Sequence, residues 1–208
     1  HDVPGLGPFP SSGLLVQVGD QLVLIDTAWT DPQTEQLADE AAQRLGAEID
    51  TLIVTHAHYD KMGGVAVLND RGVRTLAIAI TNEAATTRDL VPTRETLQLD
   101  AEDSARLADG AIEVFYPGPG HTDDNVVVYL RDSKVLFGGC MIRPGESDSL
   151  GNTADADIDR WDQSVQRVME RYPDATVVVP SHGPPAGPEL LGHTIELVTA
   201  HRAAAAEQ

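Results

Sequence analysis

The chain reads Thr55-His56-Ala57-His58-Tyr59-Asp60-Lys61-Met62-Gly63-Gly64 directly after the apolar run Leu52-Ile53-Val54. The apolar run predicts a short buried strand, and the two closing glycines permit a tight turn into a helix. In a locally extended loop, side chains at alternate positions point to one side, so His56, His58 and Asp60 can meet one metal ion. The alternative is a solvated loop whose two histidines stand together by chance.

The order of elements around this stretch occurs twice in the chain. Each half is predicted to contain a hairpin, an amphipathic helix and an apolar strand that ends near a histidine. The predicted elements span 14–18, 21–26, 31–45 and 52–54 in the first half, and 125–130, 134–137, 161–172 and 177–179 in the second. Two such halves predict an α/β fold, an αββα sandwich of two mixed sheets with helices on the outer faces.

We expect residues 1–208 to form a single domain with similar halves at about 12–80 and 111–206. Three further segments have their own patterns. Residues 3–13, rich in glycine and proline, are predicted to be a loop without strands, and residues 81–107 to be polar and mostly helical or irregular. Asp31 is expected to cap the helix that follows it, with Pro32 at the first helical position.

Composition excludes several classes of partner. Acidic residues outnumber basic ones 33 to 14, and the formal net charge of −19 opposes binding to nucleic acid or to anionic membranes. No apolar run approaches the roughly 20 residues that a membrane helix needs, and the N-terminal residues do not resemble a signal peptide. We therefore expect a soluble chain with no nucleic-acid or membrane partner. Separately from composition, we expect the protein to be a monomer.

Other metal-ligand side chains also stand where predicted strands end. Together with the first loop, the chain offers six candidate ligands at such positions: His56, His58, Asp60, His121, Cys140 and His182. A tetrahedral zinc takes four ligands, so six divide naturally into two sites of three. A thiolate beside imidazoles favours zinc over magnesium or calcium. The alternative is that the histidines are loose on loops and that Cys140, the only cysteine, is a buried apolar residue.

The remaining histidines, His1, His193 and His201, have no comparable neighbours and are interpreted as solvent or helix-face residues. Cys140 stands alone, so it cannot form an internal disulfide. Two glycines precede it, and we expect them to let a metal ion approach closely.

Several of these motifs, over nearly the whole chain, resemble the metallo-β-lactamases. The similarity is to the dizinc subclass whose second site uses Asp, Cys and His, and within it to the New Delhi branch. It rests on His56-Ala57-His58-Tyr59-Asp60, Asp26-Thr27-Ala28-Trp29-Thr30-Asp31, Tyr116-Pro117-Gly118-Pro119-Gly120-His121, Gly138-Gly139-Cys140 and Ser181-His182-Gly183. The resemblance implies the αββα sandwich, with two Zn²⁺ per chain at one edge of the two sheets.

The resemblance also implies roles for individual residues. His56, His58 and His121 would hold one zinc, and Asp60, Cys140 and His182 the other. Asp60 would also orient the nucleophile. Arg143 matches the place where the family often has a lysine that pairs with the substrate carboxylate, and Asn152 matches an asparagine near the substrate carbonyl. Leu6 and Phe9 match a mobile flap that covers bound substrate.

The chain departs from the family pattern in two places. Lys61 stands where many members have arginine, although the New Delhi branch also has lysine there. The family also has two further strands before the flap, at which this sequence begins. Either the sequence is trimmed there, or the first sheet is expected to be short, which would affect its edge and its stability.

The implied function is hydrolysis of the amide bond of β-lactam antibiotics, penicillins, cephalosporins and carbapenems, by a zinc-bound hydroxide. The family also implies a periplasmic or secreted enzyme involved in antibiotic resistance. The first alternative is another hydrolase of this fold, a lactonase or thioesterase. Those enzymes usually have His directly after the Asp and a second bridging Asp, where this chain has Lys61 and Cys140. The second alternative is a non-catalytic zinc-binding protein.

Overall fold

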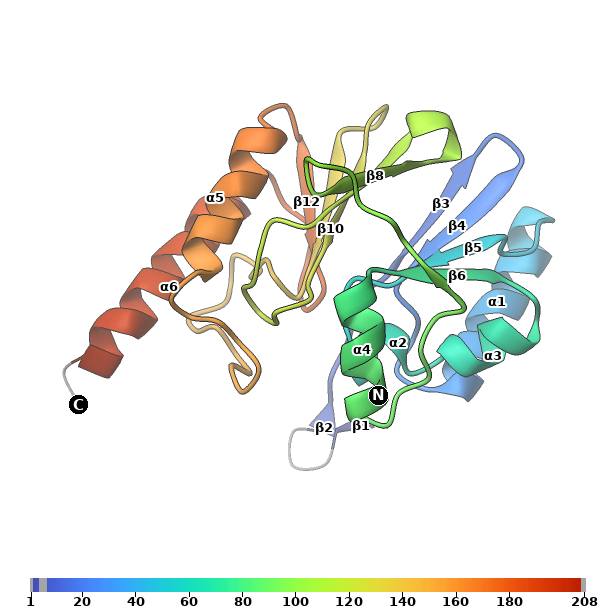
Figure 1. The fold of residues 1–208 in the computed structure, drawn as a ribbon, viewed down its shortest axis with the longest axis horizontal. Coiled ribbons are helices and arrows are strands. Elements are labelled where there is room, and N and C mark those ends of the chain that lie inside the picture. Colours follow the sequence, from blue (N-terminus) through green and yellow to red (C-terminus); the bar gives the residue numbers. More distant parts are fainter. Residues whose placement is uncertain (1, 4–6, 207–208) are drawn as a thin grey trace. The chain divides into compact units, whose positions relative to one another are not determined.

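A mixed five-stranded sheet organises the first half of the chain, residues 1–100, in the order β3-β4-β5-β6-β7 (Figure 1). Its strands are β3 (Leu14–Val18), β4 (Gln21–Ile25), β5 (Thr51–Ile53), β6 (Arg74–Ala77) and β7 (Glu95–Thr96). β3 and β4 form an antiparallel hairpin, and the other neighbours pair in parallel. The helices are α1 (Asp31–Leu45), α2 (Tyr59–Met62), α3 (Val65–Asp70) and α4 (Ala79–Thr87).

The second half, residues 101–208, forms another compact unit around a sheet in the order β12-β11-β10-β9-β8. Its elements are β8 (Ser104–Leu107), the 3₁₀ turn η1 (Ala108–Gly110), β9 (Ile112–Phe115), β10 (Val127–Leu130), β11 (Val135–Gly139), α5 (Trp161–Arg171), β12 (Val177–Pro180) and α6 (Glu189–Ala206). β11 and β12 pair in parallel, and the other neighbours are antiparallel. This computed structural model describes residues 2–3 and 7–206.

Each sheet buries one face against helices of its own unit. In the first unit, Leu22, Leu24 and Leu52 pack with α1 and α3, which lie side by side in Figure 1. In the second unit, α5 and α6 lie side by side and bury Trp161 and Val198 among strand residues. Burial of such side chains supplies most of the driving force for folding. No helix within the described ranges is long and apolar enough to cross a membrane.

The predicted repeat of elements is confirmed. In the first unit the hairpin β3–β4 is followed by α1 and then by β5, which pairs in parallel with β4. In the second unit the hairpin β10–β11 is followed by α5 and then by β12, which pairs in parallel with β11. Each crossover strand therefore ends at the same edge of its sheet as its hairpin neighbour, and candidate ligands follow the ends of β5, β11 and β12.

Some local predictions were wrong. Thr30, not Asp31, caps α1, because its hydroxyl accepts a hydrogen bond from the backbone N–H of Gln33. The predicted loop 3–13 includes one antiparallel pair of very short strands, β1 (Asp2–Val3) and β2 (Gly7–Pro8). Residues 81–107 are mostly helical or irregular, as predicted, but they also include the short strands β7 and β8, which were not predicted.

A buried carboxylate connects the second sheet to α5. Glu113 on β9 accepts hydrogen bonds from Arg171 Nε at 2.7 Å and from the Tyr172 hydroxyl at 3.0 Å. Burial acts to raise the pKa of Glu113, but the hydrogen bonds from Arg171 and Tyr172 lower it below the usual value. The carboxylate is therefore held in its charged form.

We expect Glu113→Gln to lower the free energy of unfolding at pH 7 by about 1.5–3 kcal/mol, the value of hydrogen bonds to a charged group. Because the folded-state pKa of Glu113 is lowered, this stabilisation is present above the unfolded pKa of about 4.5 and is lost as the pH falls through the folded pKa. Thermal unfolding between pH 3 and pH 7 measures it. The difference between variant and parent should shrink below pH 4.5. Glu95→Gln, which removes an exposed partner of Arg74, should change stability little at any pH.

Candidate metal centre

The first cluster of ligand side chains lies directly after β5. His56 and Asp60 are buried, His58 is half-buried, and their ligand atoms all lie within 4.8 Å of one another. The backbone at His58 is extended, as predicted, but Asp60 belongs to the single helical turn α2. The prediction of one extended loop was therefore wrong at Asp60. The three donors come together because the chain turns into a helix immediately after His58.

A hydrogen-bond relay fixes the orientation of His56. Asp26, which follows β4, accepts from the Thr55 backbone N–H at 2.8 Å and from the Thr55 hydroxyl at 2.9 Å. The same hydroxyl lies 3.1 Å from His56 Nδ1. Because the hydroxyl donates its only hydrogen to Asp26, it accepts from Nδ1–H of His56. This assigns the tautomer whose Nε2 carries a lone pair, as a metal ligand requires.

Lys61 is fully buried between two carboxylates. Its Nζ lies 3.1 Å from Asp60 Oδ2 and 3.9 Å from Asp26 Oδ2, and it donates to Ser11 Oγ at 2.6 Å. Ser11 Oγ also lies 3.0 Å from Asp60 Oδ2. Burial raises the pKa of Asp26 well above its usual range, although the charge of Lys61 opposes that rise. The charges beneath the candidate ligands therefore form one network, which sequence reasoning missed.

The two glycines after Met62, Gly63 and Gly64, stand where there is no room for a side chain. A Cβ on Gly63 would lie 2.1 Å from the backbone oxygen of Trp29, and one on Gly64 would lie 1.9 Å from Thr34 Oγ1. As predicted, the two residues form the turn that leads into α3, but neither has a positive φ, so the backbone conformation of the turn does not itself require glycine. The glycines instead let this turn lie directly against Trp29, in the loop that precedes α1, and against Thr34, in the first turn of α1.

The second cluster lies at the ends of β11 and β12. Cys140 is buried, and its Sγ lies 3.3 Å from Nε2 of the half-buried His182. Zinc binds sulfur at about 2.3 Å and nitrogen at about 2.1 Å, so two such ligands at a tetrahedral angle lie about 3.6 Å apart. The observed separation fits a shared zinc. Gly139 has φ of 58°, and a Cβ on Gly138 would lie 2.3 Å from Ile142, so the chain itself requires both glycines.

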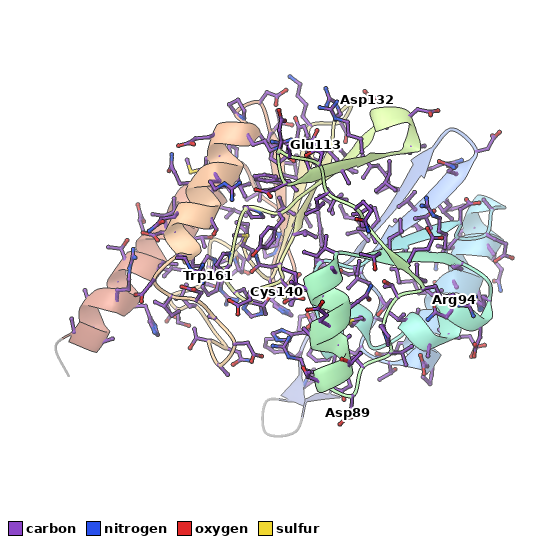
Figure 2. The ribbon with its side chains drawn as sticks, viewed as in Figure 1. Asp89, Arg94, Glu113, Asp132, Cys140 and Trp161 are labelled. Carbon is purple, nitrogen blue, oxygen red and sulfur yellow. The ribbon has the colours of Figure 1, made fainter. Side chains whose placement is uncertain are left out.

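His121 is held in the second unit by a polar loop and a tryptophan. Asn125 accepts from the backbone N–H of Thr122 at 3.0 Å and donates to the carbonyl of Gly118 at 3.1 Å. The indole of Trp161 lies edge-on to the His121 ring, with centroids 5.8 Å apart, and donates to the carbonyl of Met141 at 2.9 Å. Figure 2 labels Trp161 and Cys140, which lie near one another in this unit. Trp161 therefore supports the loops that carry His121 and Cys140, a role that the sequence did not suggest.

The predicted substrate-binding residues lie on loops. The guanidinium of Arg143 donates to the carbonyl of Ser149 and to the hydroxyl of Ser147, each at 3.2 Å, and burial lowers its pKa. Asn152 is exposed, and its side-chain oxygen accepts from the backbone N–H of Ala154 at 3.1 Å. Both side chains thus form hydrogen bonds with neighbouring residues of the loops on which they lie.

Phe9 in the predicted flap packs edge-on against Trp29, with ring centroids 6.3 Å apart. Leu6 lies outside the described residues, as does His1. The two other histidines lie on α6, as interpreted from the sequence. His193 contacts the carbonyl of Ser147 at 3.0 Å, and His201 is exposed.

The model of the metallo-beta-lactamase superfamily matches residues 6–182. The chain belongs to this superfamily. It is 36% identical over 189 residues to the metallo-beta-lactamase type 2 of Bacillus cereus, covering 91% of this chain and 73% of that protein. It is 40% identical over 196 residues to the type 2 enzyme of Pseudomonas aeruginosa, covering 94% of this chain and 77% of that protein.

Among solved structures, the metallo-β-lactamase FIM-1 of P. aeruginosa in its mono-zinc form matches with a TM-score of 0.93. It is 44% identical, and the match covers 97% of this chain and 88% of that chain. The family assignment and the fold class of two mixed sheets with helices are therefore confirmed. The assignment as an enzyme, a metallo-β-lactamase, is also confirmed. The imidazole, carboxylate and thiol donors fit the zinc on which this family depends.

Proposed function

We propose that this metallo-β-lactamase hydrolyses the amide bond of β-lactams, including penicillins, cephalosporins and carbapenems, and that it holds two Zn²⁺ per chain. The observation that carries the proposal is the set of buried and half-buried donor side chains. Three donors cluster after β5, and a thiol and an imidazole lie 3.3 Å apart after β11 and β12. A metallo-β-lactamase with every donor present has the means for hydrolysis.

In this proposal the two units form one domain, and the ligands of both contribute to one centre. His56, His58 and His121 hold one zinc, and Asp60, Cys140 and His182 hold the other. Support comes from the relatives, which match across both halves. Each set of three leaves a position for water or substrate, as catalytic zinc sites require.

Bound zinc supplies a water nucleophile at neutral pH and Lewis-acid stabilisation of the developing oxyanion. The residues of the chain supply orientation. Asp60 presents a carboxylate to the nucleophile, and Ser11 and Lys61 hold that carboxylate through its Oδ2. The relay from Asp26 through Thr55 holds His56 in one tautomer. This preorganisation means that little rearrangement is needed during the reaction.

Two loop residues and the flap contact the substrate in this proposal. The side-chain oxygen of Asn152 is occupied by Ala154, so its amide N–H₂ is the group that would donate to the carbonyl oxygen of the lactam. Phe9, and with it Leu6, would cover the apolar part of the substrate. Arg143 would bind the substrate carboxylate with both of its N–H edges.

Arg143→Ala is expected to raise KM for carboxylate-bearing β-lactams by about tenfold while changing kcat little, because it removes a charged hydrogen-bonding partner from the substrate. Steady-state kinetics measure the two constants separately. Because Arg143 also holds Ser147 and Ser149, Ser147→Ala serves as a control for loss of loop structure alone. An unchanged KM for Arg143→Ala would show that this guanidinium does not bind substrate.

Hydrolysis of a carbapenem, followed by ultraviolet absorbance, tests the proposed function. The zinc-loaded protein is compared with a chelator-treated sample and with one reloaded with zinc. Turnover that the chelator abolishes and zinc restores is the expected result. Turnover of a lactone or thioester but no β-lactam would assign the chain to the other hydrolases of this fold. Zinc binding without turnover of any of these substrates would indicate a non-catalytic zinc protein.

The proposal also covers the cellular location of the enzyme and its oligomeric state. We propose that the enzyme is periplasmic or secreted, where it meets antibiotics before they reach their targets, and that it acts as a monomer. Export would also link the activity to antibiotic resistance. Fractionation of producing cells and light scattering of the purified protein measure these two properties.

A further inference from the structure

A polar cavity, of about 310 Å³, lies in the unit formed by residues 101–208. It is bounded by the face of β8, β9 and β10 that meets the end of α5, and three arginines, Arg106, Arg131 and Arg171, line it. The chain has only 14 basic residues against 33 acidic ones. Three arginines around one cavity are therefore a marked local excess of positive charge in an acidic protein.

The register of the sheet creates this cluster. Arg106 on β8, Glu113 on β9 and Tyr129 on β10 stand opposite one another in adjacent strands, so they share one face of the sheet. Arg131 follows β10 directly, and Arg171 is the last residue of α5. Five side chains from four elements thus converge on one place, without any short sequence motif.

The buried carboxylate at the centre is already saturated. Oε1 of Glu113 accepts from Arg171 Nε and Tyr172 OH, and Oε2 accepts from Arg106 Nε at 3.4 Å and Arg131 Nη1 at 3.3 Å. Two carboxylate oxygens have about four lone-pair positions, and all four are used. Glu113 can therefore take no further N–H from the surrounding arginines.

Arg171 is held on several sides. Its Nη2 donates to Ser104 Oγ at 2.9 Å and lies 3.7 Å from Glu102, and its guanidinium carbon lies 4.6 Å from the centre of the Phe115 ring. Burial acts to lower the pKa of Arg171, but the hydrogen bond that it donates to Glu113 and the negative charge of Glu113 together raise this pKa above the usual value. Arg171 is thus a fixed wall of the cavity.

Arg106 and Arg131 have donors left over. Their side chains are 60% and 49% exposed, and among the residues that the structure describes Glu113 is the only side-chain partner of either guanidinium. Both reach the same oxygen, so two cations lie side by side at the mouth of the cavity. Each guanidinium has five N–H donors and uses one of them here. The other acidic lining residue, Asp174, already accepts from Tyr129 OH at 2.9 Å and lies 3.5 Å from Lys134.

We propose that this cavity is a binding site for a phosphate group, held between the exposed edges of Arg106 and Arg131. A single carboxylate has two oxygens and can satisfy only one guanidinium edge in bidentate fashion. A tetrahedral phosphate dianion has enough oxygens to accept from both guanidinium edges. Its negative charge also offsets the electrostatic repulsion between the two arginines. The space beside the arginines also accommodates an organic group attached to the phosphate.

The site is distinct from the candidate metal centre. Lys134 and the hairpin turn lie at the start of β11, and Cys140 follows its end. A five-residue strand spans about 16 Å, so the two sites stand at opposite ends of the sheet. Figure 2 shows Glu113 near the hairpin end and Cys140 near the other. Phosphate binding here depends on neither zinc nor the proposed lactamase activity.

Titration of the zinc-loaded protein with inorganic phosphate, followed by calorimetry at constant ionic strength in chloride, tests the proposal. Saturable binding of one phosphate per chain is expected. Arg106→Gln and Arg131→Gln should each weaken it on the order of tenfold or more, since each removes hydrogen bonds to a charged group. Arg74→Gln, which removes an exposed arginine paired with Glu95 in the first unit, should bind phosphate as the parent does.

The variants also separate this site from phosphate held by zinc. Equal phosphate affinity in the parent, Arg106→Gln and Arg131→Gln would overturn the proposal, as would the absence of saturable binding to the parent at tens of millimolar phosphate. A phosphate monoester provides the second arm. Tighter binding of the ester than of inorganic phosphate, lost in the same two variants, assigns the site to an ester, and equal affinity assigns it to free phosphate.

Discussion

Lys61→Met is expected to lower the free energy of unfolding of the zinc-free protein by about 3–5 kcal/mol, the cost of removing one partner from a buried ion pair. The side chain of Lys61 is 0% exposed, and its ammonium lies near Asp26 and Asp60. Methionine fills a similar volume but leaves two carboxylates without their shared cation. For a chain of this length the loss corresponds to a decrease of about 6–20 °C in Tm. Thermal and urea unfolding measure it.

Lys134 provides the matched control, because it is the only other lysine of the chain. Its ion pair with Asp174 is about half exposed on both sides, so Lys134→Met should cost at most about 1 kcal/mol. Lys61→Arg keeps the charge and should recover part of the stability. If Lys61→Met were no more destabilising than Lys134→Met, the three buried charges would not form the network described above.

The same variant is expected to reduce zinc affinity. Lys61 and Ser11 fix Asp60 Oδ2, and loss of a group that orients a metal ligand typically costs 10–100-fold in affinity or activity. A competition assay with a fluorescent zinc chelator measures this effect separately from stability. Lys134→Met should bind zinc as the parent does.

The grouping of the candidate ligands could be predicted because their sequence pattern is local. His56, His58 and Asp60 lie within five residues, and each of the other three candidate ligands stands in a short motif near the end of an apolar strand. Strand ends can be read from hydrophobic runs, and parallel neighbours bring their carboxyl ends to one edge. The repeat of hairpin, helix and strand was readable for the same reason.

The charges that support the ligands were not predictable in this way. Asp26 and Lys61 are 35 positions apart in the sequence, and nothing local distinguishes a buried lysine from the exposed ones that are the rule. The one signal was a carboxylate directly after the apolar strand 22–25, at a position whose φ of 63° few residues other than Gly, Asn and Asp adopt. Pairing such a residue with its cation requires the register of β4 and β5.

The polar cavity lined by Arg106, Arg131 and Arg171 could not be predicted for a similar reason. Arg106, Glu113 and Tyr129 come from three strands, one of which, β8, is only four residues long (Ser104–Leu107), too short for its polar and apolar alternation to identify it as a strand. Its place in the sheet is decided by pairing with β9 and by Arg171, whose Nη2 donates to Ser104. Tertiary contacts of this kind override local propensity.

Cys140→Ser is expected to remove one of the two proposed zinc ions and to reduce kcat/KM at least 100-fold. A serine hydroxyl is not deprotonated at neutral pH as a zinc-bound thiol is, so the second site loses its soft ligand. The substitution changes the side-chain volume little, and the fold should persist. Zinc per chain, measured by elemental analysis after dialysis at fixed free zinc, separates loss of metal from loss of structure.

His182→Asn removes the other proposed ligand of the same zinc ion, which follows β12 rather than β11. Because Cys140 Sγ and His182 Nε2 lie 3.3 Å apart, both variants should lose the same zinc, and the double variant should lose no more than either alone. His201→Asn, on the exposed part of α6, should keep both the full zinc content and the full activity. Retention of two zinc ions by Cys140→Ser and His182→Asn would exclude this pair as ligands. Loss of both ions by either variant would mean that the two sites bind zinc only together.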